Sequence, residues 1–423
     1  MPETSASPDP VDGGSKRLPR PVVALLAALF LTSFASVGQV TILGKQVFDM
    51  TGRPFDLGML GLAEFLPAFV LAPITGSVAD SFDRRRVYAI SLAGEAVFSL
   101  GLGAYVATER TALWPIFVLV VLFGVARAFV APSSRALPID LAPPQLVERV
   151  VALRSLSYQA GTISGPVLFG LAFLLGRSVP YLVATAGFLA AVGALIFVGP
   201  TVVARLARAT GYRHALRDAT DGLRLMRRAP ILSGAITLDL FAVLLGGAVA
   251  LLPAIATERL NVGAVGLGWL RATIGIGAAC AALTLSIRPL RRRVGPVLLA
   301  AVAVFGVATI VLGFTRNFVV ACAALFVLAA ADAVSVFIRA TLVPLATPED
   351  MRGRVLAVEN VFIGASNELG AVESGLAAQW LGLIPAVVGG GVGTILVVIG
   401  FWFWVPALRN VDRFAEARVD HGG

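Results

Sequence analysis

Charged residues are scarce in this sequence. Only 14% of its 423 residues are Asp, Glu, Lys or Arg, while 57% are hydrophobic and the mean hydropathy is +0.87. Soluble globular proteins carry about 25% charged residues, so the composition excludes that class. Apolar windows of about 20 residues, the length of a membrane-crossing helix, recur along nearly the whole chain. The alternation typical of a membrane β-barrel is absent. We therefore predict an all-α polytopic membrane protein.

Cysteine and histidine are almost missing. Cys280 and Cys322 lie in apolar runs, and the only histidines, His214 and His421, lie in polar segments. These numbers exclude a disulfide framework and argue against a metal site built from either residue type. The phosphate-binding pattern G-x-x-x-x-G-K-[ST] is also absent, which disfavours direct use of ATP. We expect no metal and no cofactor, with a proton gradient as the energy source.

Catalytic signatures are absent as well. The sequence contains no G-x-S-x-G, no H-E-x-x-H and no usable Cys–His pair. Asp239 and Asp332 keep an intramembrane aspartyl enzyme open as a remote alternative, and a non-transporting receptor is another. The main prediction is that the chain is not an enzyme.

The sequence is instead a series of apolar segments separated by charged, Pro and Gly clusters. Twelve such segments are predicted to be membrane helices, at 21–46, 56–80, 86–107, 112–137, 146–176, 179–203, 230–256, 264–288, 295–315, 317–345, 353–381 and 384–408.

Basic residues are distributed unevenly over the connections between these segments. With the N-terminus in the cytoplasm, 23 of the 34 basic residues fall in inner segments, 6 in outer segments and 5 within spans. The positive-inside rule then places both termini in the cytoplasm and the chain in a plasma or inner membrane. The net charge of +9 comes from residues bordering apolar spans, which fits anionic membrane lipids and not nucleic acid.

The segments group into two halves joined by a basic linker. The linker has apolar positions on one helical stripe and seven arginines, which predicts an amphipathic helix lying on the membrane surface. The predicted organisation is a disordered cytoplasmic tail at 1–20, a six-helix bundle at 21–203, the linker at 204–229, a second six-helix bundle at 230–408 and a cytoplasmic tail at 409–423.

The two halves resemble each other at an offset near 205 residues. GMLGLAEFLPA from Gly58 matches GAVGLGWLRAT from Gly263, and RALPIDLAPPQLVERV from Arg135 matches RATLVPLATPEDMRGRV from Arg339. Duplicated six-helix halves are one way to build a secondary transporter, with the substrate site between them. The repeat therefore predicts transport by alternating access.

The segment GSVADSFDRRR, from Gly76, resembles the signature of the major facilitator superfamily between its second and third helices, G-x-x-x-D-x-x-G-R-R/K. Gly76, Asp80, Arg84 and Arg85 match, while Asp83 stands where the family usually has glycine. The resemblance implies a fold of twelve helices in two bundles. It also implies that Asp80 and the arginines latch the halves together on the cytoplasmic side.

Two further stretches carry the resemblance. GTISGPVLFG resembles the antiporter motif of the family, with its last glycine one place late, and contributes Gly161, Gly165, Pro166 and Gly170. Glycines at this spacing let helices approach closely, and proline bends a helix. The block from Arg352 is similar to the branch that contains the enterobactin exporter and some drug:proton antiporters.

Ionisable residues within the spans are the candidate functional groups. Because a charge at the bilayer centre costs about 3 kcal/mol, such residues normally face other helices or a water-filled cavity. The set is Glu64, Glu95, Arg127, Asp239, Arg271, Asp332, Arg339, Glu359, Glu368 and Glu373.

Helical geometry and depth divide this set. At 100° per residue Glu359 and Glu373 share a face and Glu368 points away from it, so one helix does not aim all three into one cavity. We predict a substrate or proton pathway that uses Glu64, Arg127, Asp239, Arg271, Asp332, Arg339 and Glu373. Glu359 and Glu368 are expected to form structural pairs, and Arg135 and Arg154 to act at a gate or in topology.

The leading hypothesis is a monomeric secondary transporter that exports a small amphipathic molecule, such as a siderophore or drug, in exchange for protons. An importer, a uniporter or a lysophospholipid flippase of the same superfamily is the alternative.

Overall fold

The computed structural model describes residues 18–199, 220–221, 223–226 and 229–417. For Pro73, Asp80, Ile139 and Ala417 it describes the backbone but not the side chain. Most of the predicted N-terminal tail and most of the predicted linker therefore lie outside the described residues.

Helices make up nearly all of the described chain, and no strand occurs in it. The N-terminal half contains α1 (Arg20–Thr51), α2 (Pro54–Ser81), α3 (Arg84–Ala107), α4 (Trp114–Ala128), α5 (Val130–Leu141), η1 (Pro144–Leu146), α6 (Val147–Phe173) and α7 (Val179–Ile196). The C-terminal half contains α9 (Pro230–Leu245), η2 (Gly247–Val249), α10 (Leu252–Ala254), η3 (Ile255–Arg259), α11 (Ala264–Ile287), α12 (Val294–Phe314), α13 (Phe318–Leu345), α14 (Arg352–Leu381), α15 (Leu383–Trp404), α16 (Pro406–Arg409) and η4 (Phe414–Ala417).

Within the described residues, ten helical segments are long and apolar enough to cross a membrane. The long helices α6 and α14 occupy the other two predicted segments but carry more polar and charged residues. Each packs against a helix of the opposite half, α6 against α11 and α14 against α2. The all-helical fold predicted from the hydropathy pattern is thus confirmed.

Two predicted spans are interrupted and a third ends early, in each case near a Gly or Pro of the sequence. The fourth span divides at Phe129 into α4 and α5. The seventh leaves regular α-helix at Gly246 and continues through η2, α10 and the π-turn η3. The twelfth ends at Trp404, short of the predicted limit, because Pro406 follows. An apolar run alone does not reveal such breaks.

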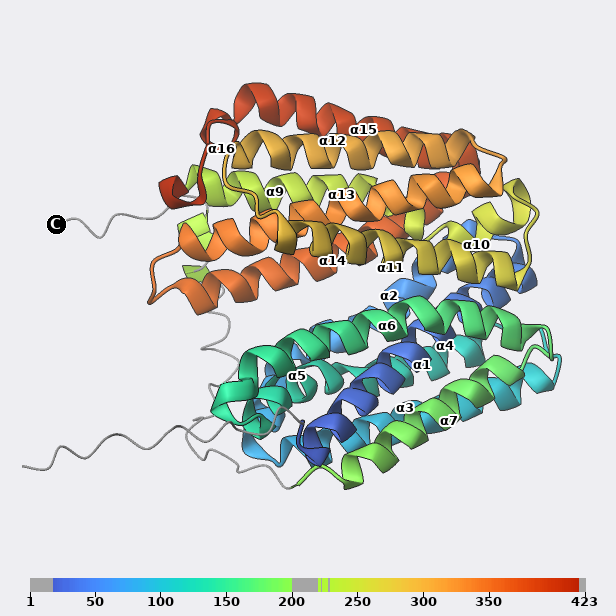
Figure 1. The fold of residues 1–423 in the computed structure, drawn as a ribbon. Helices are drawn as coiled ribbons and strands as arrows, with labels where there is room; N and C mark the ends of the chain where they lie inside the picture. Colours follow the sequence, from blue (N-terminus) through green and yellow to red (C-terminus); the bar gives the residue numbers. More distant parts are fainter. Residues whose placement is uncertain (1–17, 200–219, 222, 227–228, 418–423) are drawn as a thin grey trace, which may run out of the picture.

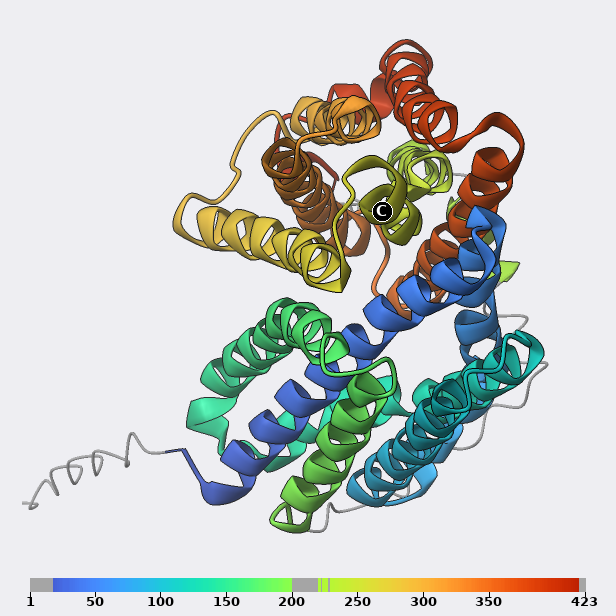
Figure 2. The ribbon, with the colours of Figure 1, turned by 90° about the vertical axis from the view of Figure 1, so that its right-hand side faces the viewer.

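The helices form two bundles that lie side by side, α1–α7 in blue to green and α9–α15 in yellow to red (Figures 1 and 2). We call the end where α1 begins and α15 ends the terminal end, and the opposite end the distal end. In Figure 1 the terminal end is on the left.

The bundles contact each other through two reciprocal helix pairs, α2 with α14 and α6 with α11. These pairs join the second helical span of one half to the fifth span of the other, a relation consistent with the sequence repeat. A Cβ atom added at Gly58 of α2 would lie 2.6 Å from the carbonyl oxygen of Ala371 of α14. One added at Gly170 of α6 would lie 2.5 Å from the carbonyl oxygen of Ala264 of α11. Glycine is therefore required for the contact on the distal side.

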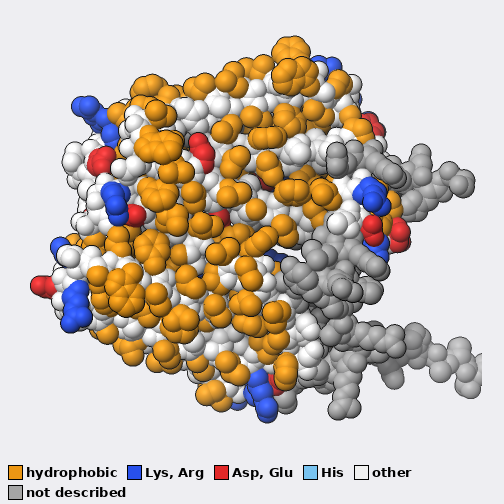
Figure 3. Space-filling view, turned by 180° about the vertical axis from the view of Figure 1, so that it is seen from behind, with side chains coloured by type: hydrophobic (Ala, Val, Ile, Leu, Met, Phe, Trp, Pro, Cys, Tyr) orange, Lys and Arg blue, Asp and Glu red, His pale blue; other side chains and the backbone are white. Residues whose placement is uncertain are grey.

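Hydrophobic side chains cover most of the face shown in Figure 3, while most Lys and Arg side chains lie toward its two ends. Large apolar side chains such as Ile90 and Phe197 are more than 70% exposed. An exposed apolar surface of this extent is expected where lipid tails surround the protein.

The C-terminal segment folds back onto the loop before α12. Leu408 and Val411 are buried in the core of the second bundle. The amide of Gly295 donates to the carbonyl of Val411 at 2.9 Å. We call residues 406–417 the C-terminal clip.

Candidate functional site

A cavity of about 460 Å³ lies where the two bundles face each other. We call it the interface cavity. Its wall comes from α1, α2, α4 and α5 of the first bundle and from α11 and α14 of the second. The charged residues in the wall are Glu64, Arg127, Arg271 and Glu368.

These four charges come from four different helices and from both halves. Glu64 of α2 and Arg127 of α4 form an ion pair. Glu368 of α14 lies close enough to interact electrostatically with both. Arg271 of α11 interacts electrostatically with Glu64, and its buried Nε has no hydrogen-bond partner among the described residues. The structure therefore brings together three predicted pathway residues and adds Glu368, for which we expected only a structural pairing.

A second cavity of about 550 Å³ lies within the N-terminal bundle. We call it the bundle cavity. It adjoins the interface cavity, because Val37, Arg127 and Ala131 line both. Its lining comes from α1, α3, α4, α5 and α6 and is rich in hydroxyl groups and arginines.

One acid lines the bundle cavity. Glu95 of α3 is 0% exposed, and neither of its carboxyl oxygens has a hydrogen-bond partner in the described part of the chain. Nearby, the hydroxyls of Tyr88 and Thr32 are hydrogen bonded at 2.7 Å. A carboxyl group that is fully buried without a partner is costly, so a ligand, a water or a proton is expected to satisfy it.

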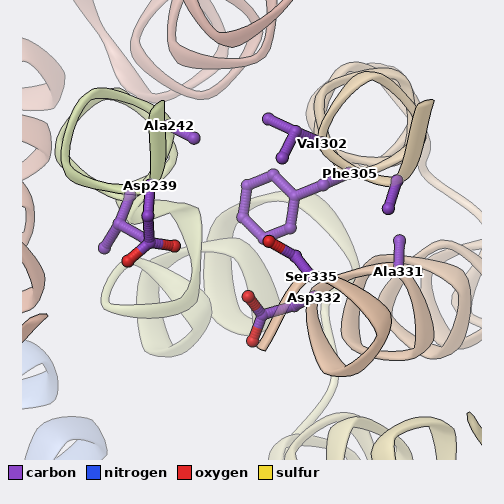
Figure 4. A pocket seen from close by; sticks show the side chains of 9 residues that line it. Asp239, Ala242, Val302, Phe305, Ala331, Asp332 and Ser335 are labelled. Carbon is purple, nitrogen blue, oxygen red and sulfur yellow. The ribbon is translucent and has the colours of Figure 1, made fainter. Parts of the chain in front are cut away.

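A third polar cluster lies inside the C-terminal bundle. Asp239 of α9 and Arg339 of α13 form a buried ion pair at 2.7 Å, with side chains 7% and 4% exposed. Asp332 and Glu359 also interact electrostatically with Arg339. Figure 4 shows Asp239 and Asp332 on the wall of a small void between α9, α12 and α13. The void has a volume of about 10 Å³, so it has room for a single water at most.

The predicted latch residues lie near the terminal end of the first bundle. Arg84 pairs with Asp140 at 2.8 Å, and Arg85 donates to the carbonyl of Val198 at 2.7 Å. These partners belong to the same bundle. The side chain of Asp80 lies outside the described residues, and a Cβ atom at Gly76 would meet nothing within 4 Å. The latch between the halves stays a prediction.

The residues of the antiporter-like motif lie where α6 meets other helices. A Cβ at Gly161 or Gly165 would come within 2.7 Å of the backbone of Phe30 or Phe34 of α1. Gly170 and the carbonyl of Pro166 approach α11 instead. The stretch thus lets α6 pack simultaneously on its own bundle and on the opposite one.

Glu373 is separated from the other predicted pathway residues. It is exposed on α14, lines neither cavity, and accepts a hydrogen bond from its neighbour Ser374 at 3.3 Å. Glu359, which shares its helical face, is 6% exposed. The same face of α14 is therefore covered near the terminal end and exposed farther along, which helical angles alone do not predict.

Sequence reasoning missed several residues of the bundle cavity. Glu95 was recognised as an in-span acid but not assigned to a pathway, and Arg135 and Arg154 were assigned only to a gate or to topology. Tyr88 and Tyr158 also line this cavity. The sequence feature that could have revealed this cavity is that α1, α3, α5 and α6 all carry polar residues in the halves that lie toward the terminal end.

Comparison with known proteins decides the family. A family model described as "Transmembrane secretion effector" matches residues 26–421. The chain belongs to this family of the major facilitator superfamily. This superfamily consists of transporters, not enzymes, so the chain is a multi-span membrane transporter with a small-molecule substrate. The predictions of family and of a non-enzymatic role are confirmed.

Two curated relatives of this superfamily member match it over most of their length. The chain is 28% identical over 395 residues to YfiS of Bacillus subtilis, named an uncharacterized MFS-type transporter, covering 89% of this chain and 91% of that protein. It is 25% identical over 402 residues to the enterobactin exporter EntS of Shigella dysenteriae, covering 90% and 92%.

Solved structures of other transporters have the same fold. A bacterial homologue of the human lysosomal transporter Spinster, in an inward-facing and unoccupied conformation, matches with a TM-score of 0.73 at 14% identity, covering 97% of this chain and 100% of that one. The nucleoside transporter NupG matches with a TM-score of 0.70 at 14% identity, covering 92% and 99%.

Proposed function

We propose that this transporter exports a small amphipathic molecule in exchange for protons, by alternating access. The observation that carries the proposal is the interface cavity, because both bundles contribute charged groups to it. A site shared between two bundles changes its access when the bundles rock. Its wall also contains apolar residues such as Val40 and Phe65, which suits a substrate with polar and apolar parts.

The positions of the close contacts support access from the terminal end. The helix pairs meet at Gly58 and Gly375 on one side of the molecule and at Gly170 and Gly268 on the other, all in the distal halves of their helices. With the termini in the cytoplasm, as the distribution of basic residues predicts, this arrangement is an inward-facing state. An exporter loads its substrate in that state.

Proton coupling is assigned to the cluster around Arg339. Three carboxyl groups, those of Asp239, Asp332 and Glu359, surround one guanidinium, so full ionisation would leave two uncompensated negative charges in the bundle. A proton on one carboxyl reduces that charge, and Arg339 can then change partner. Asp239 is the proposed carrier, because it forms the ion pair that such a change would break.

The direction of transport rests on the family. The matched family model describes secretion effectors, and EntS is named an exporter. The proposed location is the plasma or inner membrane, with a monomer as the working unit and anionic lipids around its basic terminal end. In this proposal Asp80 and Arg84 form the latch, and Gly161, Gly165, Pro166 and Gly170 let α6 pivot.

Transport into inverted membrane vesicles tests the proposal. A panel of siderophores, amphipathic acids and cationic dyes is assayed with and without an imposed pH gradient. We expect accumulation of at least one compound that depends on the gradient. We also expect Asp239→Asn to abolish gradient-driven accumulation but retain exchange of substrate for substrate.

Glu373→Gln is the matched control, because Glu373 is an in-span acid that lines neither cavity. It should accumulate substrate as the natural protein does. Accumulation that ignores the pH gradient, or that persists unchanged in Asp239→Asn, contradicts the proposed coupling.

A further inference from the structure

The arginines of the bundle cavity differ in their partners. Arg127 is paired with Glu64. Arg135 and Arg154 have no hydrogen bond or ion pair with any described residue, and the Nε atom of Arg154 is buried. The two are also close enough to repel each other electrostatically. The cavity thus holds two neighbouring guanidinium groups that form no ion pair with a described acid. The one acid in its wall, Glu95, interacts electrostatically with Arg127 instead.

Their depth separates these arginines from the basic residues of the loops. Arg135 lies six residues before the end of α5, and Arg154 lies seven residues after the start of α6. At about 1.5 Å per residue, both are roughly 10 Å from the helix ends. They line the cavity rather than border the span, so lipid headgroups outside the bundle are not their natural partner.

The rest of the lining selects what kind of anion fits. Hydroxyl groups of Ser36, Ser134, Ser155 and Tyr158 line the wall, and Leu29 and Val130 add apolar surface. A volume of about 550 Å³ accommodates an organic molecule, since ligand pockets run from about 300 to 1,000 Å³. Guanidinium groups bind carboxylate, sulfonate or phosphate groups through paired hydrogen bonds.

The C-terminal bundle contrasts with this arrangement. Its buried arginine, Arg339, is already paired with Asp239, and the void beside that pair holds about 10 Å³. Binding of an external anion there would first have to displace a buried carboxylate. Among the cavities that lie inside a single bundle of the described chain, only the one in the N-terminal bundle combines space with arginines that have no ion-pair partner.

We propose that the transported molecule is an organic anion whose acidic group binds between Arg135 and Arg154 in the bundle cavity. The inference rests on the proposed function and specifies its substrate class. It assigns the first bundle to the substrate and the second to the proton. The acid enters from the terminal end and its apolar part extends toward the interface cavity, which shares Val37 and Ala131 with the bundle cavity.

Equilibrium binding in lipid nanodiscs, without any gradient, tests this assignment separately from transport. Three radiolabelled probes share one ring system and differ in charge: 1-naphthoate, its methyl ester and 1-naphthylmethylammonium. We expect saturable binding of the naphthoate at concentrations up to about 1 mM and at least about tenfold weaker binding of the other two.

The variants Arg135→Gln and Arg154→Gln should each weaken naphthoate binding about tenfold, since each removes a charge-assisted contact. Arg154→Lys should recover part of the affinity, because it restores the charge without the paired geometry. Arg291→Gln, an exposed arginine at the same end that lines neither cavity, should bind like the natural protein.

Equal binding of the three probes, absence of saturable naphthoate binding, or unchanged affinity in Arg154→Gln overturns the assignment. Naphthoate binding that follows the expected pattern supports it even if transport proves independent of protons. The two proposals therefore fail in different experiments.

Discussion

At the scale of residues, the buried charges are the most informative feature of this transporter. Each described in-span group has a different setting: Glu64 and Arg127 are paired, Glu95 is buried alone, and Arg339 lies among several acids. A partner of opposite sign offsets part of the free-energy cost of burying a charge. When a substitution removes that partner, the other charge stays buried and the full cost reduces the stability of the protein. The settings therefore predict which substitutions are tolerated.

Arg339 is expected to matter more for stability than any one of its acidic partners. Arg339→Met leaves Asp239, Asp332 and Glu359 without a cation and should reduce the free energy of unfolding by about 3–5 kcal/mol. Asp239→Asn should cost less, because Arg339 keeps two other acids nearby. Thermal unfolding in nanodiscs measures both variants. A larger loss in Asp239→Asn than in Arg339→Met would contradict the arrangement.

Residue types and helical spacing predicted part of this pattern. Helical spacing places Asp332, Ser335 and Arg339 on one face of α13, and Asp332 and Ser335 line the same void. The pairing of Arg339 with Asp239 was not predictable, because it joins two helices whose relative rotation is determined by packing. The exposure of Glu373 was not predictable either, because the neighbouring helices decide which part of a helical face is covered.

At the scale of elements, glycines control how closely α2 and α14 approach. Gly58→Leu places a side chain against the backbone of Ala371 and Val372, so the distal contact between the bundles has to open. Overpacking of this kind costs about 1–3 kcal/mol, and we expect substrate accumulation in vesicles to fall about tenfold.

Gly193→Leu on α7 is the control for this substitution, because a Cβ at Gly193 meets nothing within 4 Å. Its accumulation should match that of the natural protein. Normal accumulation by Gly58→Leu would show that the distal contact is not part of the transport cycle.

The C-terminal clip is the element whose pH dependence can be derived. The carboxylate of Asp412 accepts hydrogen bonds from the amide of Arg293 at 3.0 Å and from Nε of Arg292 at 3.1 Å. These bonds hold the pKa of Asp412 below its ordinary value. A lowered pKa means that the stabilisation is complete above the ordinary aspartate pKa of about 4 and is lost as the pH falls toward the lowered value.

Hydrogen exchange of the Gly295 amide measures the clip, because this amide donates to Val411. Asp412→Ala should increase its exchange at neutral pH relative to the natural protein. The two proteins should converge after correction for intrinsic exchange only when the pH falls well below about 4. Equal protection at neutral pH would remove Asp412 from the clip.

At the scale of the whole molecule, the two bundles and the position of the cavities define the transport cycle. Distal contacts hold the halves together, and the charged cavities lie between and within them. The proposed inward-facing assignment depends on which end faces the cytoplasm. That orientation is the broadest prediction made from the distribution of arginine and lysine.

Single-cysteine labelling tests the orientation. In a background with Cys280→Ala and Cys322→Ala, cysteines replacing Arg110 or Arg316 at the distal end should react with a membrane-impermeant maleimide in intact cells. A cysteine replacing Glu349 at the terminal end should react only after permeabilisation. The opposite pattern would reverse the proposed direction of loading.

The sequence by itself determined the class, the helical spans and the division into two related halves. Hydropathy and length are local properties that the chain carries whatever its packing, and a bilayer admits few alternatives to helices. The tertiary structure alone decided which in-span charges meet, where the helices break and where the space for a substrate remains. Those features depend on the relative rotation and depth of helices that are far apart in the chain. The same rotation and depth bring Glu64 to Arg127 and Asp239 to Arg339.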